Sequence, residues 1–189
     1  DEREHARSRM QLTRTRSQLP DFLGRENSWN ASERSKLAQN SVNFRRKGLV
    51  SIIIVNYNGG NLLRTILDSI NKSNVKNYEI LIVDNNSSDG SQEFLKKNYK
   101  NIKLVLNKRN LGYSGINSAL KYCKGEFILF LNNDMEIDKN CLGRLVEAVK
   151  SGKDVAMAAP KLINFYNRGM KSGGTWLSRA FYGGHIKEN

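Results

Sequence analysis

Apolar residues between positions 48 and 160 fall in short, nearly unbroken runs that alternate with amphipathic stretches. Four runs rich in β-branched and aliphatic residues predict strands, the first of them buried on both faces: 50–55 (VSIIIV), 78–83 (YEILIV), 102–106 (IKLVL) and 126–131 (EFILFL). Apolar positions three and four apart predict helices between them, the first opening at Asn61 as a capping residue. A helix over 139–150 follows the fourth strand, and a fifth strand is expected over 154–159.

Strands that alternate with helices of about ten residues indicate right-handed crossovers. The pattern therefore predicts an α/β fold with an open, mostly parallel, Rossmann-like sheet and helices on both faces. When the predicted strands are numbered along the chain, their spatial order in the sheet should be third, second, first and fourth. Crossovers that wind in both directions from the first strand then leave a crevice between the first and fourth strands.

Residues 1–47 have few aliphatic positions and many Arg, Ser, Asn and Gln. Low hydrophobicity with high charge cannot offset the entropy lost on folding, so this stretch predicts a flexible basic arm, with a short helix around residues 32–40. A solvated tail is the simpler interpretation, and docking to an anionic surface is the functional one. The folded domain is expected over residues 48–189.

The formal net charge is +13, which favours anionic partners: a nucleotide, a phosphate-bearing acceptor, an acidic membrane surface or nucleic acid, without distinguishing among them. Cys123 and Cys141 have no metal or redox spacing and fall in segments expected to be amphipathic helix, so two buried thiols are predicted. No run of eighteen apolar residues and no signal-peptide core is present. These features predict a cytoplasmic protein, with the inner face of the membrane as a place of contact through the arm.

Short polar residues cluster directly after each of the four predicted strands, at 56–60, 84–89, 107–115 and 132–134. Ligands of open parallel sheets bind at the carboxyl ends of the strands, so these loops are expected to share one site. Tight turns and helix caps use the same residue types, and one such loop alone would favour that reading.

Two carboxylates in these loops indicate more specific chemistry. Asp84 directly follows an apolar strand, where it can accept hydrogen bonds from a base N–H or a ribose hydroxyl. Asp134 ends another apolar strand with Asn neighbours, and it offers hard oxygen ligands to Mg²⁺ or Mn²⁺. A diphosphate can complete the coordination shell of such a metal.

Four strings in this order resemble the family 2 glycosyltransferases with the GT-A fold: VSIIIVNYNGG, EILIVDNNSSDGS, NLGYSGINSAL and GEFILFLNND. The similarity covers about residues 49–160 and is greatest to the rhamnosyltransferase-like branch. It implies the nucleotide-sugar-binding half of an inverting enzyme of cell-surface polysaccharide biosynthesis. Such an enzyme transfers a hexose or deoxyhexose from a nucleoside-diphosphate sugar to a glycan or lipid-linked acceptor.

The resemblance also implies a role for each loop. Asp84 would hold the base, and residues 132–134 stand where the family has its Asp-X-Asp motif, so Asp134 would bind Mg²⁺ or Mn²⁺. Asn132 departs from that motif and removes one negative charge, which predicts weaker metal binding. The residues expected at the nucleotide sugar are Asn56, Tyr57, Asn58, Asp84, Asn86, Asn110, Gly112, Tyr113, Asn132 and Asn133.

The implied mechanism is direct displacement at the anomeric carbon, with a carboxylate that deprotonates the acceptor hydroxyl. That base belongs to a later segment of the family and is not identified here. Glu136, Asp138 and Asp154 have the wrong setting, Glu188 lies at the end, and His185 is isolated in a Gly-rich loop. We therefore expect a chain truncated before its acceptor half, which binds donor without turnover.

Two other functions fit parts of the pattern. A sugar-phosphate nucleotidyltransferase shares the α/β layout but needs a basic phosphate loop after the first strand, and NYNGGN has no basic residue. A non-catalytic module could bind a nucleotide sugar or use the arm on an anionic surface. The arm has no RNA-binding signature, so no nucleic-acid partner is expected.

Overall fold

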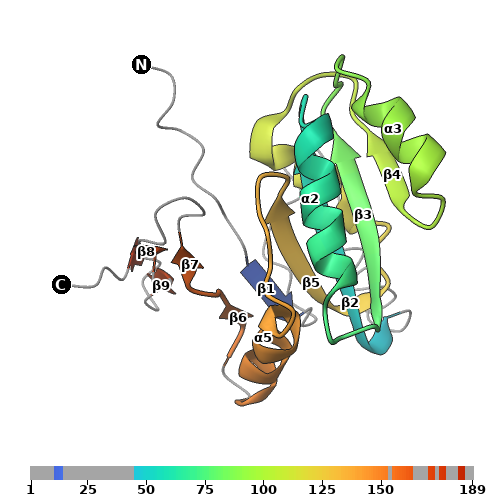
Figure 1. The fold of residues 1–189 in the computed structure, drawn as a ribbon. Coiled ribbons are helices and arrows are strands. Elements are labelled where there is room, and N and C mark those ends of the chain that lie inside the picture. Colours follow the sequence, from blue (N-terminus) through green and yellow to red (C-terminus); the bar gives the residue numbers. More distant parts are fainter. Residues whose placement is uncertain are drawn as a thin grey trace, which may run out of the picture.

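A computed structural model describes residues 11–14, 45–152, 155–163, 170–172, 175–177 and 183–185, with side chains at 45–152 and 155–163. Its main sheet has six strands in the order β4-β3-β2-β5-β1-β6 (Figure 1). The strands β2 (Arg46–Asn56), β3 (Tyr78–Asp84), β4 (Lys103–Leu106) and β5 (Gly125–Asn132) are the four predicted from the apolar runs, and they pair in parallel. The predicted order of these strands and the α/β class are confirmed.

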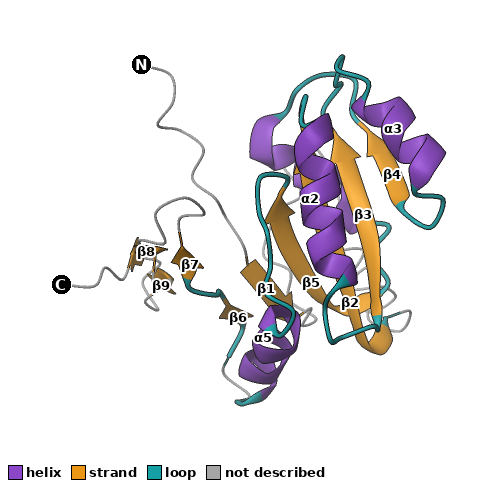
Figure 2. Cartoon of the chain, in the orientation of Figure 1, coloured by secondary structure: helices purple, strands orange, loops and turns teal. Residues whose placement is uncertain are grey.

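The central strands are buried on both faces because their side chains alternate between two apolar layers. Ile52 and Ile54 of β2 pack in the larger layer, whereas Ile53 packs in the smaller one, and none of the three has exposed surface. Three helices cover the larger layer: α2 (Gly60–Asn71), α3 (Ser91–Asn98) and α5 (Cys141–Lys150) (Figure 2). The 3₁₀ helix η1 (Gly112–Ile116) and helix α4 (Asn117–Leu120) cover the smaller layer.

Two details of the helices differ from the prediction. Asn61 does not cap α2, which begins two residues earlier than predicted, at Gly60, with Gly59 at the cap position and no side-chain cap. The Gly60 N–H instead donates to the Asp89 carboxylate 2.9 Å away, which a local sequence pattern cannot reveal. Cys123 lies beyond the end of α4, and burial raises the pKa of both cysteine thiols to about 11. Such thiols stay protonated at neutral pH, consistent with a structural role.

Residues 11–14 form a strand, β1 (Gln11–Arg14), inside the stretch predicted to be a flexible arm. β1 lies antiparallel between β5 and β6 (Met157–Ala158), and β2 begins at Arg46 rather than after residue 47. The alternating Gln-Leu-Thr-Arg of β1 is too short to stand out from its polar surroundings. The helix expected at 32–40 lies outside the described residues, and the division into arm and domain stays a prediction.

Beyond Pro160 the described backbone forms two small antiparallel pairs. β7 (Leu162–Ile163) pairs with β8 (Met170–Ser172), and β9 (Thr175–Leu177) pairs with β10 (Gly183–His185). Among the described residues, no helix is both long and apolar enough to cross a bilayer.

Candidate functional site

The four polar loops leave the carboxyl ends of the four neighbouring parallel strands β4, β3, β2 and β5, so they lie at the same end of the sheet (Figure 1). The last residues of β2 and β3, Asn56 and Asp84, are direct partners in the parallel register. On the other side of β2, Val55 pairs with Asn132 at the end of β5. The predicted convergence of these loops therefore follows from register as well as strand order.

Asp84 is fully buried and accepts four hydrogen bonds. Its Oδ1 accepts from the Ser87 N–H at 2.9 Å and from Gln92 Nε2 at 2.8 Å. Its Oδ2 accepts from Asn56 Nδ2 at 2.9 Å and from Ser87 Oγ at 2.7 Å. A carboxylate has about four acceptor positions, so this set fills them. The arrangement balances the cost of burying the charge.

Asn56 connects Asp84 to the loop after β5. This asparagine has no exposed surface, and its Oδ1 accepts a hydrogen bond from Asn133 Nδ2 at 2.9 Å. Asn133 and Asn132 are half-buried, whereas the neighbouring Asp134 is exposed. The proposed metal ligand thus faces solvent one residue from a buried hydrogen-bond chain.

The loops after β2 and β3 also hold each other. Asn58 Oδ1 accepts from the Ser88 N–H at 2.8 Å, and the Asn58 N–H donates to Ser87 Oγ at 2.9 Å. Asn58 and Asn86 have φ of 50° and 66°, a left-handed conformation that asparagine tolerates better than most residues. Tyr57, on the same loop as Asn58, is 49% exposed and available to a ligand.

A second hydrogen-bond network fixes the loop after β4. Buried Asn85 donates from Nδ2 to the Gly112 carbonyl at 2.8 Å and to Asn110 Oδ1 at 3.3 Å. Its Oδ1 accepts from Asn107 Nδ2 at 2.8 Å. Tyr113, which follows, is 37% exposed. Asn110 and Gly112, both predicted at the nucleotide sugar, are therefore fixed to Asn85, directly after the end of β3.

Gly115 leaves the space in which this second network forms. A Cβ at this position would lie 2.5 Å from Asn85 Oδ1 and 3.0 Å from Asn107 Nδ2. We expect Gly115→Ala to lower the free energy of unfolding by about 1–3 kcal/mol, because the buried amides must move apart. The measurement is urea denaturation.

The matched control is Gly143→Ala in α5, where a Cβ would lie 3.5 Å from Val75 Cγ2. This contact is an ordinary one, and alanine favours a helix over glycine by about 0.5–1 kcal/mol. The control should therefore be neutral or stabilising. Equal losses for both variants would contradict the role given to Gly115.

Asp89 joins the first turns of two helices. Its Oδ2 accepts from the Gly60 N–H of α2 at 2.9 Å, and its Oδ1 accepts from the Ser91 N–H of α3 at 3.1 Å and from the Ser91 hydroxyl. Partial burial alone would raise the pKa of the Asp89 carboxyl, but these hydrogen bonds outweigh it and hold the pKa below its ordinary value.

A lowered pKa in the folded state means that Asp89 stabilises the fold above the ordinary aspartate pKa and loses this effect as pH falls through the lower folded value. We expect Asp89→Asn to destabilise the protein more at pH 6 than at pH 3, because the stabilising contribution of the carboxylate decreases as pH falls below the ordinary aspartate pKa. Urea unfolding of both proteins across this range measures the difference. A difference that does not change with pH would contradict the assignment.

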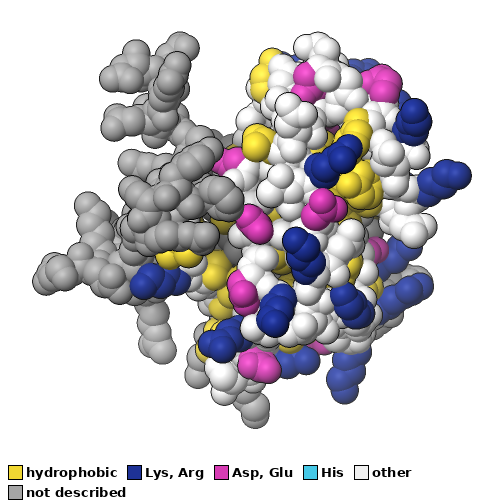
Figure 3. All heavy atoms as spheres, viewed as in Figure 1, with side chains coloured by type: hydrophobic (Ala, Val, Ile, Leu, Met, Phe, Trp, Pro, Cys, Tyr) yellow, Lys and Arg dark blue, Asp and Glu magenta, His cyan; other side chains and the backbone are white. Residues whose placement is uncertain are grey.

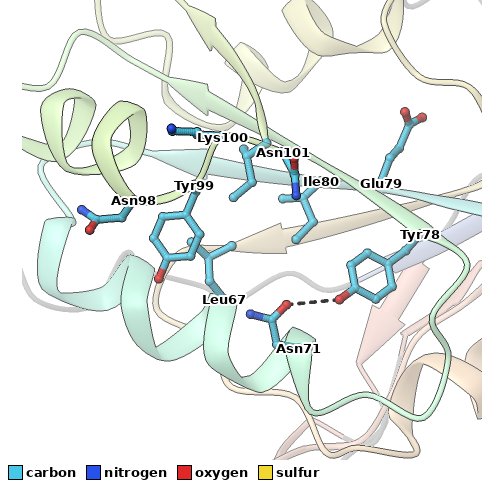
Figure 4. A pocket seen from close by; sticks show the side chains of 10 residues that line it. Leu67, Asn71, Tyr78, Glu79, Ile80, Asn98, Tyr99, Lys100 and Asn101 are labelled. Atoms are coloured by element: carbon cyan, nitrogen blue, oxygen red, sulfur yellow. Dashed lines mark hydrogen bonds between the residues drawn. The ribbon is translucent and has the colours of Figure 1, made fainter.

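A hollow of about 340 Å³ lies at the opposite end of the strands, where β3 begins (Figure 4). Asn71 at the end of α2 accepts a hydrogen bond from the Tyr78 hydroxyl at 3.2 Å, and Tyr99 and Lys100 line the same hollow. Burial raises the pKa of both tyrosines above its ordinary value. The hollow is separate from the polar loops and receives no role in the predicted site.

No individual role is predicted from the sequence for the residues that support the site: Asn85, Ser87, Asp89, Gln92, Asn107 and Ser118. Most lie in the same loops, but Gln92 and Ser118 come from α3 and α4. Their residue types are common in turns and helix ends, so no local signal separates them from solvated positions. Their contacts require the three-dimensional structure.

The parallel strands β2 to β5, with interlocked polar loops at their carboxyl ends, form the class of α/β sheet that binds its ligands at this end. The chain matches the family model described as glycosyl transferase family 2 over residues 51–187, and it belongs to this family. The resemblance recognised from the four strings is thereby confirmed at the level of the family. The rhamnosyltransferase-like branch stays a prediction.

Two curated relatives are named as bacterial glucosyltransferases. Poly(ribitol-phosphate) beta-glucosyltransferase of Bacillus spizizenii is 37% identical over 61% of this chain and 19% of its own length. An Escherichia coli enzyme named UDP-Glc:alpha-D-GlcNAc-diphosphoundecaprenol beta-1,3-glucosyltransferase is 39% identical over 46% of this chain and 35% of its own. The chain thus spans between a fifth and about a third of these two relatives.

One solved structure supports the fold. The mannosyltransferase PcManGT from Pyrobaculum calidifontis, solved in complex with GDP-Man and Mn²⁺, superposes with a TM-score of 0.50 at 22% identity. The match covers 60% of this chain and 33% of the mannosyltransferase. At this identity it shows a shared fold.

Proposed function

We propose that this chain is the nucleotide-sugar-binding part of a glycosyltransferase that acts by metal-assisted displacement with inversion. The observation that carries the proposal is the hydrogen-bond chain Asn133–Asn56–Asp84. It joins the loop that contains Asp134 to the loops after β2 and β3, which are proposed to bind the nucleotide. These loops lie at the carboxyl ends of the strands, where parallel sheets bind their ligands. Family membership supports the same activity.

The names of the relatives support the choice of donor and acceptor. One names UDP-Glc as donor and a diphosphoundecaprenol-linked sugar as acceptor, and the other names poly(ribitol-phosphate). We propose a nucleoside-diphosphate sugar as donor, with UDP as the first nucleotide to test, and a glycan or lipid-linked acceptor. Both relatives extend well beyond the part that this chain matches, so the acceptor is proposed for the whole protein.

The residues around Asp134 fit a divalent metal that also binds the donor. Among the described residues, no group of three or more His, Cys, Asp or Glu side chains could enclose an ion. One exposed carboxylate with amide oxygens beside it suits Mg²⁺ or Mn²⁺ held mainly through substrate phosphates. When bound, the metal would supply positive charge to the departing diphosphate. Asp134 would hold it, with Asn132 approaching the ribose or the metal.

Asp84 is proposed to orient the base, but the four hydrogen bonds that it already accepts limit how it can do so. A base N–H can reach the carboxylate only if one donor gives way. The Ser87 amide is backbone, and Asn56 is fully buried, so both are held in place. Gln92 has a long, half-buried side chain and is the donor that can be displaced at the lowest cost.

The base that deprotonates the acceptor hydroxyl is not assigned. Glu136 and Asp138 are exposed, and Asp138 Oδ1 accepts a hydrogen bond from the Asn140 N–H at 2.8 Å in the turn before α5. The side chains of Asp154, His185 and Glu188 lie outside the described residues. The chemical step on the acceptor is therefore proposed for the whole protein.

Calorimetric titration tests the proposal, with UDP-glucose, UDP-GlcNAc, GDP-mannose and UTP as ligands, each with and without Mn²⁺. We expect a diphosphate sugar to bind more tightly with Mn²⁺ than without it. Preferential binding of UTP together with a sugar 1-phosphate would favour the nucleotidyltransferase alternative. Binding of none of these ligands would favour a module that binds an anionic surface.

Peripheral membrane contact is proposed through the basic arm, and a second basic surface formed by residues 94–124 is proposed to add to it. Residues 94–124 contain eight Lys and Arg residues and no Asp or Glu, and all eight side chains are exposed. Figure 3 shows Lys and Arg side chains along the side of the molecule where α3 lies in Figure 1. Each basic residue near an anionic bilayer contributes about 1 kcal/mol.

Sedimentation with vesicles tests this contact. We expect binding to vesicles of phosphatidylcholine mixed with phosphatidylglycerol at low salt, weakened by high salt and absent with phosphatidylcholine alone. The double substitution Lys97→Glu and Lys100→Glu should reduce binding more than Arg144→Glu on α5. Equal binding to both kinds of vesicle would contradict an electrostatic contact.

A further inference from the structure

An unbroken hydrogen-bond chain crosses the ends of three neighbouring strands. Asn133, just beyond β5, donates to Asn56 Oδ1 at 2.9 Å, and Asn56 at the end of β2 donates to Asp84 Oδ2 at 2.9 Å at the end of β3. Asn56 has no exposed surface, so both ends of its amide are committed inside the protein. The amide can accept from one side and donate to the other in only one orientation.

We infer that Asn56 is a positioning residue that couples metal binding at the Asp134 loop to nucleotide binding at the Asp84 loop. The inference rests on the proposed function of the two loops. Asn133 adjoins Asp134, so a metal ion held by Asp134 restrains the turn that places Asn133 Nδ2. That nitrogen orients the Asn56 amide, which in turn orients Asp84. A nucleotide bound at Asp84 would stabilise the same orientation, because coupling between two sites is reciprocal.

A diphosphate that contacts the metal also couples the two sites directly, so the contribution of Asn56 must be separated from this effect. Substitutions that break the Asn133–Asn56 bond leave the direct contact intact. They should lower the metal-dependent gain in nucleotide affinity without removing it. A residue with only a structural role would lower affinity by the same factor with and without metal.

Gly59 makes a selective test available. A Cβ at Gly59 would lie 2.1 Å from Asn133 Nδ2 and 2.8 Å from Asn56 Oδ1, in the middle of the hydrogen bond. The φ of Gly59 is −118°, which other residues adopt, so alanine adds a methyl group without left-handed backbone strain. Gly59→Ala therefore separates the two amides while both remain present.

The next residue supplies a matched control. A Cβ at Gly60 would lie 3.4 Å from Asp89 Oδ2 and 3.5 Å from Ser91 Oγ, at ordinary contact distances. Gly60→Ala places the same methyl group one residue away and spares the Asn133–Asn56 bond. Asn133→Ala is a second test variant, which removes the donor from a half-buried turn and cannot create a clash.

The experiment measures the dissociation constant of UDP with and without Mn²⁺ for the unaltered chain and the three variants. The gain from the metal is the dissociation constant without Mn²⁺ divided by the constant with Mn²⁺. We expect this ratio to fall roughly two- to tenfold in Gly59→Ala and Asn133→Ala, as for the loss of one hydrogen bond. Gly60→Ala should keep the ratio of the unaltered chain. An unchanged ratio in both test variants would overturn the inference. An unaltered chain that does not bind UDP, or binds it without any effect of Mn²⁺, would instead overturn the proposed function on which the inference rests.

Discussion

Replacement of Asp84 by alanine is expected to lower the free energy of unfolding by about 2–5 kcal/mol, because several buried donors lose their acceptor together. The donors are Asn56 Nδ2, the Ser87 amide and hydroxyl, and Gln92 Nε2. Asn56 cannot turn to water, since it is fully buried. UDP affinity should fall with and without Mn²⁺, because the proposed partner of Asp84 is the base rather than the metal.

Urea denaturation measures the change in stability, and Asp68→Ala is the control. Asp68 is an exposed carboxylate on α2, and its removal should change the free energy of unfolding by no more than about 0.5 kcal/mol. A loss at Asp84 as small as at Asp68 would show that the four hydrogen bonds do not stabilise the fold.

The sheet and its strand order were predictable because the information lies in short, continuous segments. The run Ile52–Ile53–Ile54 is apolar at every position, which is possible only where both faces of a strand are covered. Because β2 and β3 run parallel, their last residues, Asn56 and Asp84, meet at the same end of the sheet. The same logic predicted that the loop holding Asp134 would lie nearby.

The contacts within the site were less predictable because they join residues far apart in the chain. The Asn133–Asn56 bond spans 77 positions, and the Gly60 N–H at the start of α2 finds its acceptor on Asp89, 29 positions away. Local sequence shows that a residue can form a hydrogen bond, not which partner it has. Strand β1 was missed for a related reason, since four residues pair only because β5 and β6 present open edges.

Replacement of Asp134 by alanine should leave the stability of the fold unchanged and remove the effect of Mn²⁺ on UDP affinity, unlike replacement of Asp84. Asp134 is exposed, so its loss should change the free energy of unfolding by no more than about 0.5 kcal/mol. It is the proposed protein ligand of the metal, and its loss should remove the gain in UDP affinity that Mn²⁺ provides. A charge-assisted interaction of this kind is worth about 1.5–3 kcal/mol, or roughly 10- to 150-fold in affinity.

We propose that the sheet binds a nucleoside diphosphate at the carboxyl ends of its parallel strands, through a metal held by Asp134. The most direct test of this proposal is a titration of UDP into the unaltered chain and into Asp134→Ala, each with and without Mn²⁺, after equal folding of the two has been verified by circular dichroism. The account predicts that Mn²⁺ tightens UDP binding to the unaltered chain and has no effect on Asp134→Ala. An equal effect of Mn²⁺ on both proteins would contradict it and remove Asp134 from the metal site.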